Sequence, residues 1–170
     1  MKKIIFLALS LIALLPLRLM AETIPATDSR LTFVGRALES DGALTFDFPA
    51  TYFRVAFTGK SLSMRVSDSK RDFFAVWIDS PTSAEPTRIV EVKGNDTIIQ
   101  LILPEDVKKS KIKEHQVVIQ KRTEAGCGKT TVHAFITDGK FLQAAPFKER
   151  QIEFIGDSYT CGYGVDAPSR

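Results

Sequence analysis

The sequence predicts a mainly β fold, an antiparallel β-sandwich, followed by the start of a second structural unit. The first observation is that apolar and polar residues alternate in short runs between Leu31 and Asp138. The second is that turn-forming residues separate these runs, while only Pro104 to Glu114 suggests a helical turn. Short strands at such spacing are typical of antiparallel sandwiches. A new apolar pattern begins at Gln151, after a charged stretch.

The first predicted strands have a period of two, which is typical of strands with one buried face. Apolar side chains alternate with other residues in segments 44–48, 53–57 and 62–66. We therefore expect the apolar side chains of these three segments to face one shared core.

Two later runs, Phe73 to Ile78 and Ile98 to Leu103, are more densely apolar and predict central strands of the sandwich. The remaining predicted strands are Gln116 to Gln120 and Thr131 to Thr137. Glycine and asparagine turn signals separate the strands, at Asp41-Gly42, Thr58-Gly59-Lys60, Lys93-Gly94-Asn95-Asp96, Ala125-Gly126-Cys127-Gly128 and Asp138-Gly139.

The domain organisation follows from changes in composition along the chain. Residues 22–30 form a polar leader, and residues 140–150, with Pro146 and a charged end, predict a linker. We expect the sandwich to occupy residues 28–147, and residues 151–170 to form the start of a second unit.

The N-terminus predicts a secretory signal peptide over residues 1–21. Two lysines precede a short apolar run, and Leu19-Met20-Ala21 resembles a signal-peptidase site. The run is short for a membrane span, so we expect no stable membrane insertion after cleavage, although an uncleaved anchor helix is the alternative. The chain is therefore expected to be periplasmic, cell-surface or secreted.

Charge then argues against nucleic acid as a partner. The chain has 23 basic and 20 acidic residues, and residues 1–21 contain three of the basic residues and no acid. The exported form is therefore close to neutral, which provides no electrostatic basis for binding nucleic acid.

Nucleotide and metal sites are also disfavoured. Gly126 to Thr131 superficially resembles a phosphate-binding loop, but Thr123 stands where the first glycine belongs, and a strand pattern follows where a helix is needed. No cluster of histidine, cysteine or acidic residues has metal-ligand spacing, so we expect no cofactor. Cys127 and Cys161 are expected to be two separate thiols, with a disulfide left open because export permits one.

Ser158 is the candidate catalytic residue. The predicted strand Gln151 to Ile155 runs into Gly156-Asp157-Ser158, with further glycines at 162 and 164. A strand that ends in a tight turn can expose a serine hydroxyl and direct backbone N–H groups at a developing oxyanion. A Gly-Asp-Ser sequence by itself is also a common turn, which is the structural alternative.

The longer sequence of residues 152–164, Ile-Glu-Phe-Ile-Gly-Asp-Ser-Tyr-Thr-Cys-Gly-Tyr-Gly, resembles the first block of the SGNH (GDSL-type) hydrolases. Within that superfamily it is most similar to the carbohydrate esterase family 2 acetyl esterases, which place a jelly-roll β-sandwich before the SGNH domain. The resemblance covers about residues 30–165. Segments of the sandwich also support it, namely residues 30–36, 74–79 and 115–124.

The resemblance implies a role for each residue of the serine block. Ser158 would be the nucleophile and its N–H one oxyanion donor, while Asp157 and Gly156 would support the serine loop. The family also uses a glycine from a later block, a later asparagine and a histidine base near its C-terminus. Gly162 and Gly164 belong to the serine block itself, and no asparagine or histidine follows Ser158 within the 170 residues. The α/β SGNH domain is therefore expected to be incomplete here, and the chain alone to be inactive.

Other residues that might supply this chemistry have simpler explanations. Asn95 lies in a predicted turn, and His115 and His133 lie in predicted strands, where a structural or surface histidine is the default. Trp77, the lone tryptophan, lies within an apolar run and is expected in the core rather than on a sugar-binding surface. Asp79 is expected to cap a turn.

The resemblance implies a secreted serine esterase that deacetylates plant-type polysaccharides such as xylan or glucomannan. Its expected partner is an acetylated polysaccharide or oligosaccharide, and neither nucleic acid nor a nucleotide. The alternative is a non-catalytic secreted β-sandwich that acts as a carbohydrate-binding module. A secreted structural or interaction domain is a third reading of the same pattern.

Overall fold

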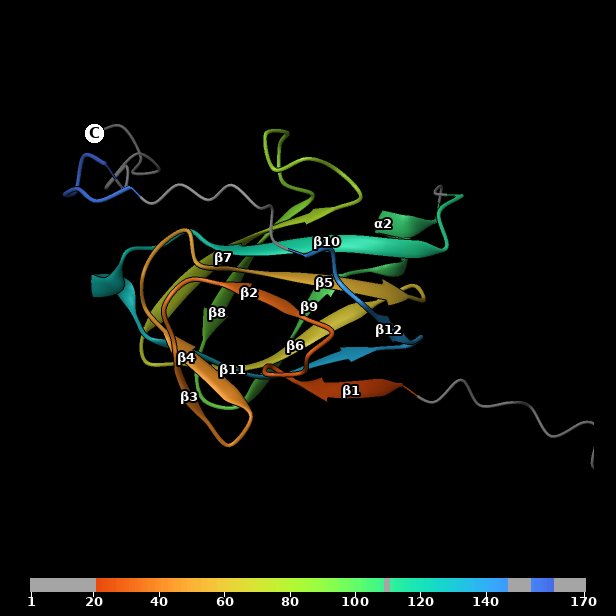
Figure 1. Cartoon of the computed structure of the whole chain (residues 1–170), viewed down its shortest axis with the longest axis horizontal. Helices are drawn as coiled ribbons and strands as arrows, with labels where there is room; N and C mark the ends of the chain where they lie inside the picture. The colour runs from red at the N-terminus through yellow and green to blue at the C-terminus, as the bar shows by residue number, and fades with distance from the viewer. Residues whose placement is uncertain (1–20, 109–110, 147–153, 161–170) are drawn as a thin grey trace, which may run out of the picture.

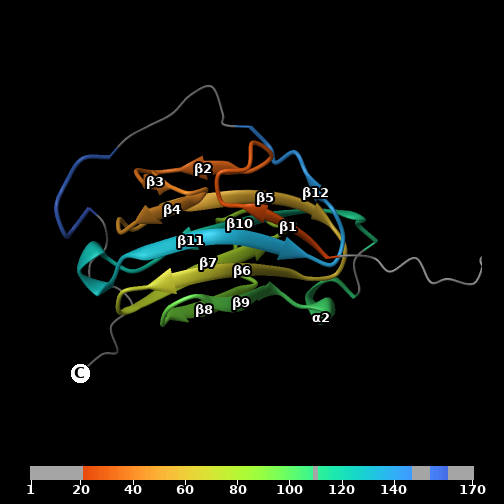
Figure 2. The ribbon, with the colours of Figure 1, turned by 90° about the horizontal axis from the view of Figure 1, so that it is seen from below.

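The computed structural model describes residues 21–108, 111–146 and 154–160, and within them the chain forms two antiparallel sheets of six strands each (Figures 1 and 2). The predicted signal peptide lies outside the described residues, apart from Ala21. The prediction of a β-sandwich is confirmed, because the two sheets stack face to face around one apolar core.

The first sheet has the strand order β3-β4-β11-β6-β9, with β1 pairing to β11. Its strands are β1 (Glu22–Pro25), β3 (Leu38–Ser40), β4 (Ala43–Phe46), β6 (Leu62–Asp68), β9 (Thr97–Ile102) and β11 (Thr130–Thr137). Because β11 pairs with β1, β4 and β6, the end of the sandwich sequence is bound to its beginning.

The second sheet has the strand order β12-β5-β10-β7-β8, with β2 pairing to β5. Its strands are β2 (Thr32–Val34), β5 (Tyr52–Thr58), β7 (Arg71–Ile78), β8 (Arg88–Lys93), β10 (Glu114–Lys121) and β12 (Phe141–Leu142). Strand β10 pairs with β5 on one side and β7 on the other, so it lies at the centre of this sheet.

The core confirms the buried faces predicted for segments 53–57 and 62–66, and for segment 44–48 as far as Phe46. Leu62, Met64 and Val66 of β6 have no exposed surface, whereas Arg65 between them faces solvent. A cluster of phenylalanine rings joins the sheets, with ring centroids 4.9–6.2 Å apart among Phe33, Phe46, Phe53, Phe74 and Phe135. Full burial of one such side chain stabilises a fold by about 1.5–3 kcal/mol.

The prediction of two central strands is half right. Strand β7 has two neighbours, but β9 pairs only with β6 and lies at the edge of its sheet. Ile98 on β9 is accordingly 63% exposed. The high proportion of apolar residues in this run therefore does not mean that β9 pairs with a strand on each side. It reflects Leu101 and Ile102, which are buried where the strand ends.

The segment 44–48 is strand only as far as Phe46. Phe48 is 54% exposed, and the chain leaves the sheet before Pro49, whose nitrogen cannot donate to a ladder. Ala50 then has a positive φ of 63°, which reverses the chain direction before β5.

The predicted helical turn within 104–114 is present as the single turn α2 (Pro104–Val107). Its first residue is proline, which suits the start of a helix, and the N–H of Leu103 donates to Asp106 Oδ2 at 2.8 Å. A 3-10 turn, η1 (Ala125–Cys127), occupies the predicted glycine-rich loop.

The predicted linker of residues 140–150 is wrong in its first half. Phe141 and Leu142 form β12, and Phe141 is buried. The N–H of Ala144 donates to the carbonyl of Arg30 at 2.8 Å, so this segment is held against residues before β2. The predicted polar leader of residues 22–30 is also wrong, because β1 pairs with β11 and Ile24 is buried in the core, so the sandwich begins before residue 28. Residues 147–150 lie outside the described residues, and the boundary near 148–150 stays a prediction.

No helix within the described residues is long and apolar enough to cross a membrane.

Candidate functional site

The serine block is described over residues 154–160, all of which are exposed. Of the predicted strand Gln151 to Ile155, residues 151–153 lie outside the described part, while Phe154 and Ile155 are not in a strand. These two apolar side chains are 80% and 91% exposed. A turn then spans residues 158–160.

Local contacts explain why this turn needs its sequence. The N–H of Tyr159 donates to Asp157 Oδ1 at 3.0 Å, the side-chain-to-backbone bond by which aspartate commonly stabilises a turn. A Cβ atom on Gly156 would collide with the side chain of Thr160. Asp157 and Gly156 therefore determine the shape of the turn that carries Ser158.

Neither histidine is set up as a base for Ser158. His115 is 3% exposed, and its Nδ1 lies 2.7 Å from Asp79 Oδ2. His133 Nε2 lies 2.8 Å from the hydroxyl of Ser67, on the outer face of the first sheet. Both histidines have partners within the sandwich, as expected for structural histidines.

The expected roles of Trp77 and Asn95 are confirmed, whereas the carboxylate of Asp79 binds β10 rather than its own turn. Trp77 is 7% exposed, and its indole N–H donates to the carbonyl of Ala84 at 2.9 Å. Asp79 ends β7 with a positive φ of 52°, and its Oδ1 accepts the N–H of Gln116. Asn95 lies in the turn between β8 and β9.

The strand that argued against a phosphate-binding loop is present, since β11 begins at Thr130. Within the part of the chain that the structure describes, no three histidine, cysteine or acidic side chains are placed to hold a metal ion. The thiol of Cys127 lies 3.6 Å from Glu124 Oε2. Cys161 is outside the described residues, so the two separate thiols stay a prediction.

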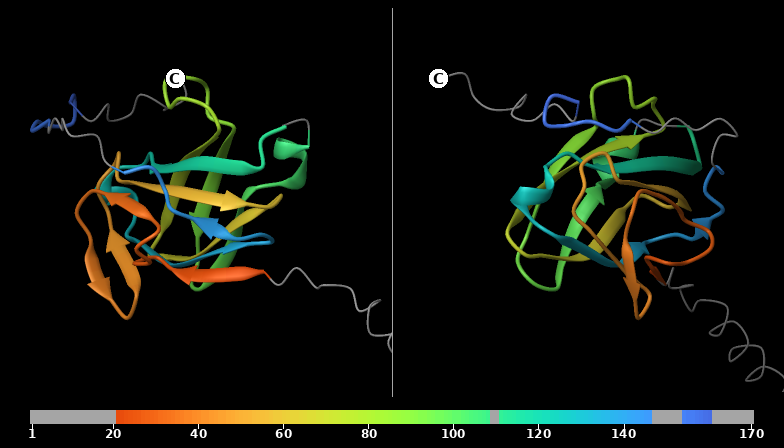
Figure 3. Two further views of the ribbon diagram at one scale, coloured as in Figure 1. Left: turned by 45° about the vertical axis from the view of Figure 1, so that its right-hand side comes forward. Right: turned by 60° about the vertical axis from the view of Figure 1, so that its left-hand side comes forward.

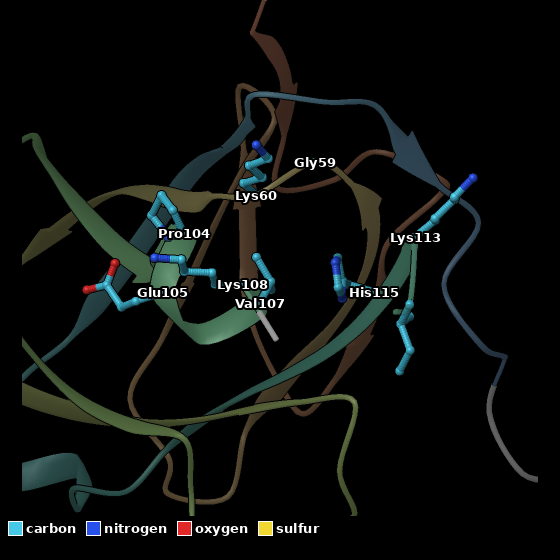
Figure 4. A pocket seen from close by; sticks show the side chains of 9 residues that line it. Gly59, Lys60, Pro104, Glu105, Val107, Lys108, Lys113 and His115 are labelled. Atoms are coloured by element: carbon cyan, nitrogen blue, oxygen red, sulfur yellow. The ribbon is translucent and has the colours of Figure 1, made fainter. Parts of the chain in front are cut away.

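A pocket of about 770 Å³ opens at one end of the sandwich, a feature that sequence reasoning missed. Three segments form it: the β5–β6 turn, the helix α2, and the chain leading into β10 (Figure 4). In the ribbon, α2 lies beside the start of β10 (Figure 3, left). The lining residues are Gly59, Lys60, Pro104, Glu105, Val107, Lys108, Ile112, Lys113 and His115. The only sequence signal was the number of lysines between positions 108 and 113.

Comparison with known proteins identifies the sandwich. Residues 33–146 match the family described as Carbohydrate esterase 2 N-terminal. The chain belongs to this family. The match runs from within β2 to the segment after β12, and therefore covers every strand described above except β1.

Two curated relatives of this carbohydrate esterase 2 domain come from Cellvibrio japonicus (strain Ueda107), and both are named acetylxylan esterase / glucomannan deacetylase. One is 33% identical over 171 residues, which cover 95% of this chain and 44% of the relative. The other is 28% identical over 147 residues, which cover 85% of this chain and 38% of the relative. The chain thus spans less than half the length of these relatives.

Solved structures agree with the family assignment. A family two carbohydrate esterase from Cellvibrio japonicus has a TM-score of 0.76 and 26% identity, over 88% of this chain and 43% of its own. A family two carbohydrate esterase from Clostridium thermocellum, in complex with cellohexaose, has a TM-score of 0.70 and 28% identity. That match covers 82% of this chain and 41% of the other.

Proposed function

We propose that this chain is the N-terminal part of a secreted serine esterase that removes acetyl groups from polysaccharides such as xylan or glucomannan. The observation that carries the proposal is the order of parts. A carbohydrate esterase 2 N-terminal domain over residues 33–146 is followed by a turn that exposes Ser158. The names of the two curated relatives support this choice of substrate.

In the proposed reaction, the Ser158 hydroxyl attacks the carbonyl carbon of a sugar acetate while a base takes its proton. The backbone N–H of Ser158 donates to the oxyanion. The bond to the sugar oxygen then breaks, the sugar leaves as an alcohol that takes up the proton, and the acetyl group stays on Ser158. Water releases acetate and restores the serine.

Asp157 has a supporting role in this proposal. Its carboxylate accepts the N–H of Tyr159, so it shapes the backbone on which the serine is carried. Because both histidines of the chain are bound within the sandwich, we propose that the base comes from outside residues 1–170 and that the chain alone is inactive.

The test compares acetate release from acetylated xylan by three proteins: the longest product of the gene, its Ser158→Ala variant, and the 170-residue chain. We expect activity in the first alone. As a matched control, Ser83→Ala changes an exposed serine in the loop after β7 and should leave the rate unchanged. Full activity of Ser158→Ala would exclude the proposed nucleophile.

A second candidate function is carbohydrate binding without catalysis. It is favoured by the completeness of the sandwich, whose core is closed by β1 and β12 without any contribution from residues 154–160. Binding predicts that the chain is retained on polysaccharide, and that Ser158→Ala does not change this retention. Retention of the chain with no acetate release by any gene product would favour this second function.

A further inference from the structure

The pocket at the end of the sandwich is lined by an excess of positive charge. Lys60, Lys108 and Lys113 line it, and Glu105 is the one acidic residue among the lining residues. All three lysines are exposed, and within the described residues none of their ammonium groups has an ion pair or hydrogen bond. Three unneutralised cations around one concavity attract an anion.

The backbone on one side of this pocket is held rigidly. The carboxylate of Asp138 accepts the N–H groups of Lys60 and Ser61 at 2.7 and 3.0 Å. Gly59 has a φ of 117°, and a Cβ atom there would collide with Asp138 and Gly139. The turn that presents Lys60 is therefore determined before any ligand arrives, which reduces the entropic cost of binding.

A buried polar group also reaches the pocket. His115 is 97% buried yet lines the pocket, and Asp79 holds its ring through Nδ1 (Figure 4). When Nδ1–H donates to Asp79, Nε2 is left as a hydrogen-bond acceptor. An oriented acceptor of this kind suits a hydroxyl group.

The rest of the wall is apolar. Val107, which is buried, lines the pocket together with Pro104 and Ile112. An inorganic anion such as phosphate would use the lysines but not these surfaces. A sugar ring has C–H faces that pack on apolar side chains, hydroxyls that reach a histidine, and, in uronic acids, a carboxylate for lysines. A volume of about 770 Å³ is within the range of small-molecule pockets.

We propose that this pocket binds a uronic acid residue of an acidic polysaccharide, with its carboxylate at Lys60, Lys108 and Lys113 and a hydroxyl at His115. The inference rests on the proposed function, because a polysaccharide esterase meets such side groups on its substrate. The pocket would then select acidic regions of the polymer, independently of the chemistry at Ser158.

The experiment is a calorimetric titration of the chain at low salt with two oligosaccharides. One is a xylo-oligosaccharide that carries a single glucuronic acid, and the other is the same oligosaccharide without it. We expect at least tenfold tighter binding of the acidic compound, weakened by added salt. Equal affinity for both compounds would overturn the proposal. Inorganic phosphate is titrated in parallel, and binding as tight as that of the acidic sugar would show a generic anion site.

Variants test the residues one at a time. Each exchange of Lys60, Lys108 or Lys113 for Gln should weaken binding of the acidic sugar about two- to fivefold, and the triple exchange at least tenfold. Lys129→Gln, at an exposed lysine outside the pocket, is the matched control and should bind normally. An unchanged affinity in the triple variant would overturn the assignment.

The same titration separates this inference from the proposed function. Ser158→Ala should bind the acidic sugar like the parent chain, because the pocket does not contain Ser158. If the unchanged longest gene product released no acetate but still preferred the acidic sugar, the esterase proposal alone would be contradicted. Intact esterase activity with no preference for the acidic sugar would contradict the pocket assignment alone.

Discussion

The ammonium group of Lys121 lies 2.8 Å from the carboxylate of Asp72, and neither side chain has any exposed surface. The pair joins β10 to β7 inside the sandwich. Lys121 also donates to the carbonyl of Thr123 at 2.7 Å, and Thr130 donates to Asp72 Oδ2 at 3.0 Å. The buried charges are thus surrounded by hydrogen bonds, which a stable buried pair requires.

Replacing Lys121 with methionine should destabilise the sandwich strongly. The change leaves Asp72 buried without its cation, and such a loss costs about 3–5 kcal/mol. Urea unfolding followed by the fluorescence of Trp77 measures it. Lys129→Met, at an exposed lysine, is the control and should change the free energy of unfolding by less than about 0.5 kcal/mol. A Lys121→Met protein as stable as the control would show that the pair contributes little.

The neighbouring Asp68 predicts a dependence of stability on pH. Burial raises the pKa of Asp68, and the adjacent carboxyl of Asp72 raises it further. Burial also acts to raise the pKa of Asp72, but hydrogen bonds from Lys121 and Thr123 outweigh it, so that this pKa is lowered. The pKa values of the two carboxyls are therefore shifted in opposite directions from the ordinary value of 3.8.

A raised pKa stabilises the folded state below the unfolded pKa, and this contribution is lost as pH rises through the folded pKa. A lowered pKa contributes above the unfolded pKa and is lost as pH falls. In Asp68→Asn the pH-dependent contribution of the raised pKa is absent. The stability of the variant relative to the parent should therefore rise as pH increases from about 4 to the raised pKa of Asp68, measured by unfolding at each pH. A difference that stays constant over this range would contradict the raised pKa of Asp68.

Two glycines provide a matched pair for a packing test. A Cβ atom on Gly139 would overlap the carbonyl of Thr58, where β5 ends, whereas a Cβ atom on Gly126 meets nothing within 4 Å. Gly139→Ala should cost about 1–3 kcal/mol through overpacking. Gly126→Ala should be neutral within about 0.5 kcal/mol. Thermal unfolding of both variants is the measurement, and equal melting temperatures would show that the backbone at Gly139 relaxes freely.

Trp77 should order the loop that follows β7. Its indole N–H donates to the carbonyl of Ala84, which lies in that loop. Trp77→Phe keeps an aromatic ring in the core but removes this donor, at a cost of about 1 kcal/mol. Amide hydrogen exchange should accelerate in residues 80–87 and stay unchanged in β11. Unchanged exchange in the loop would show that other contacts hold it.

Most of the strands and the turn at Ser158 could be predicted from the sequence, whereas β1, β3, β8 and β12 could not. Alternation in residues 53–57 and 62–66 predicts buried faces, because neighbouring side chains of a strand point to opposite sides. Gly156 and Asp157 similarly indicate a turn, because a steric restriction and a side-chain hydrogen bond act over a few residues. Such local effects can be predicted from neighbouring residues alone.

The fold was needed to show which strands lie at the sheet edges and which side chains from distant segments lie together. The run 98–103 is as apolar as a central strand but pairs on one side alone. Lys121 contacts Asp72, and Lys60 and His115 line one pocket, across long sequence separations. These contacts depend on how distant segments pair and stack. The apolar periodicity of a segment shows which of its side chains are buried. It does not show which other segments they contact, because those contacts depend on the packing of the whole chain.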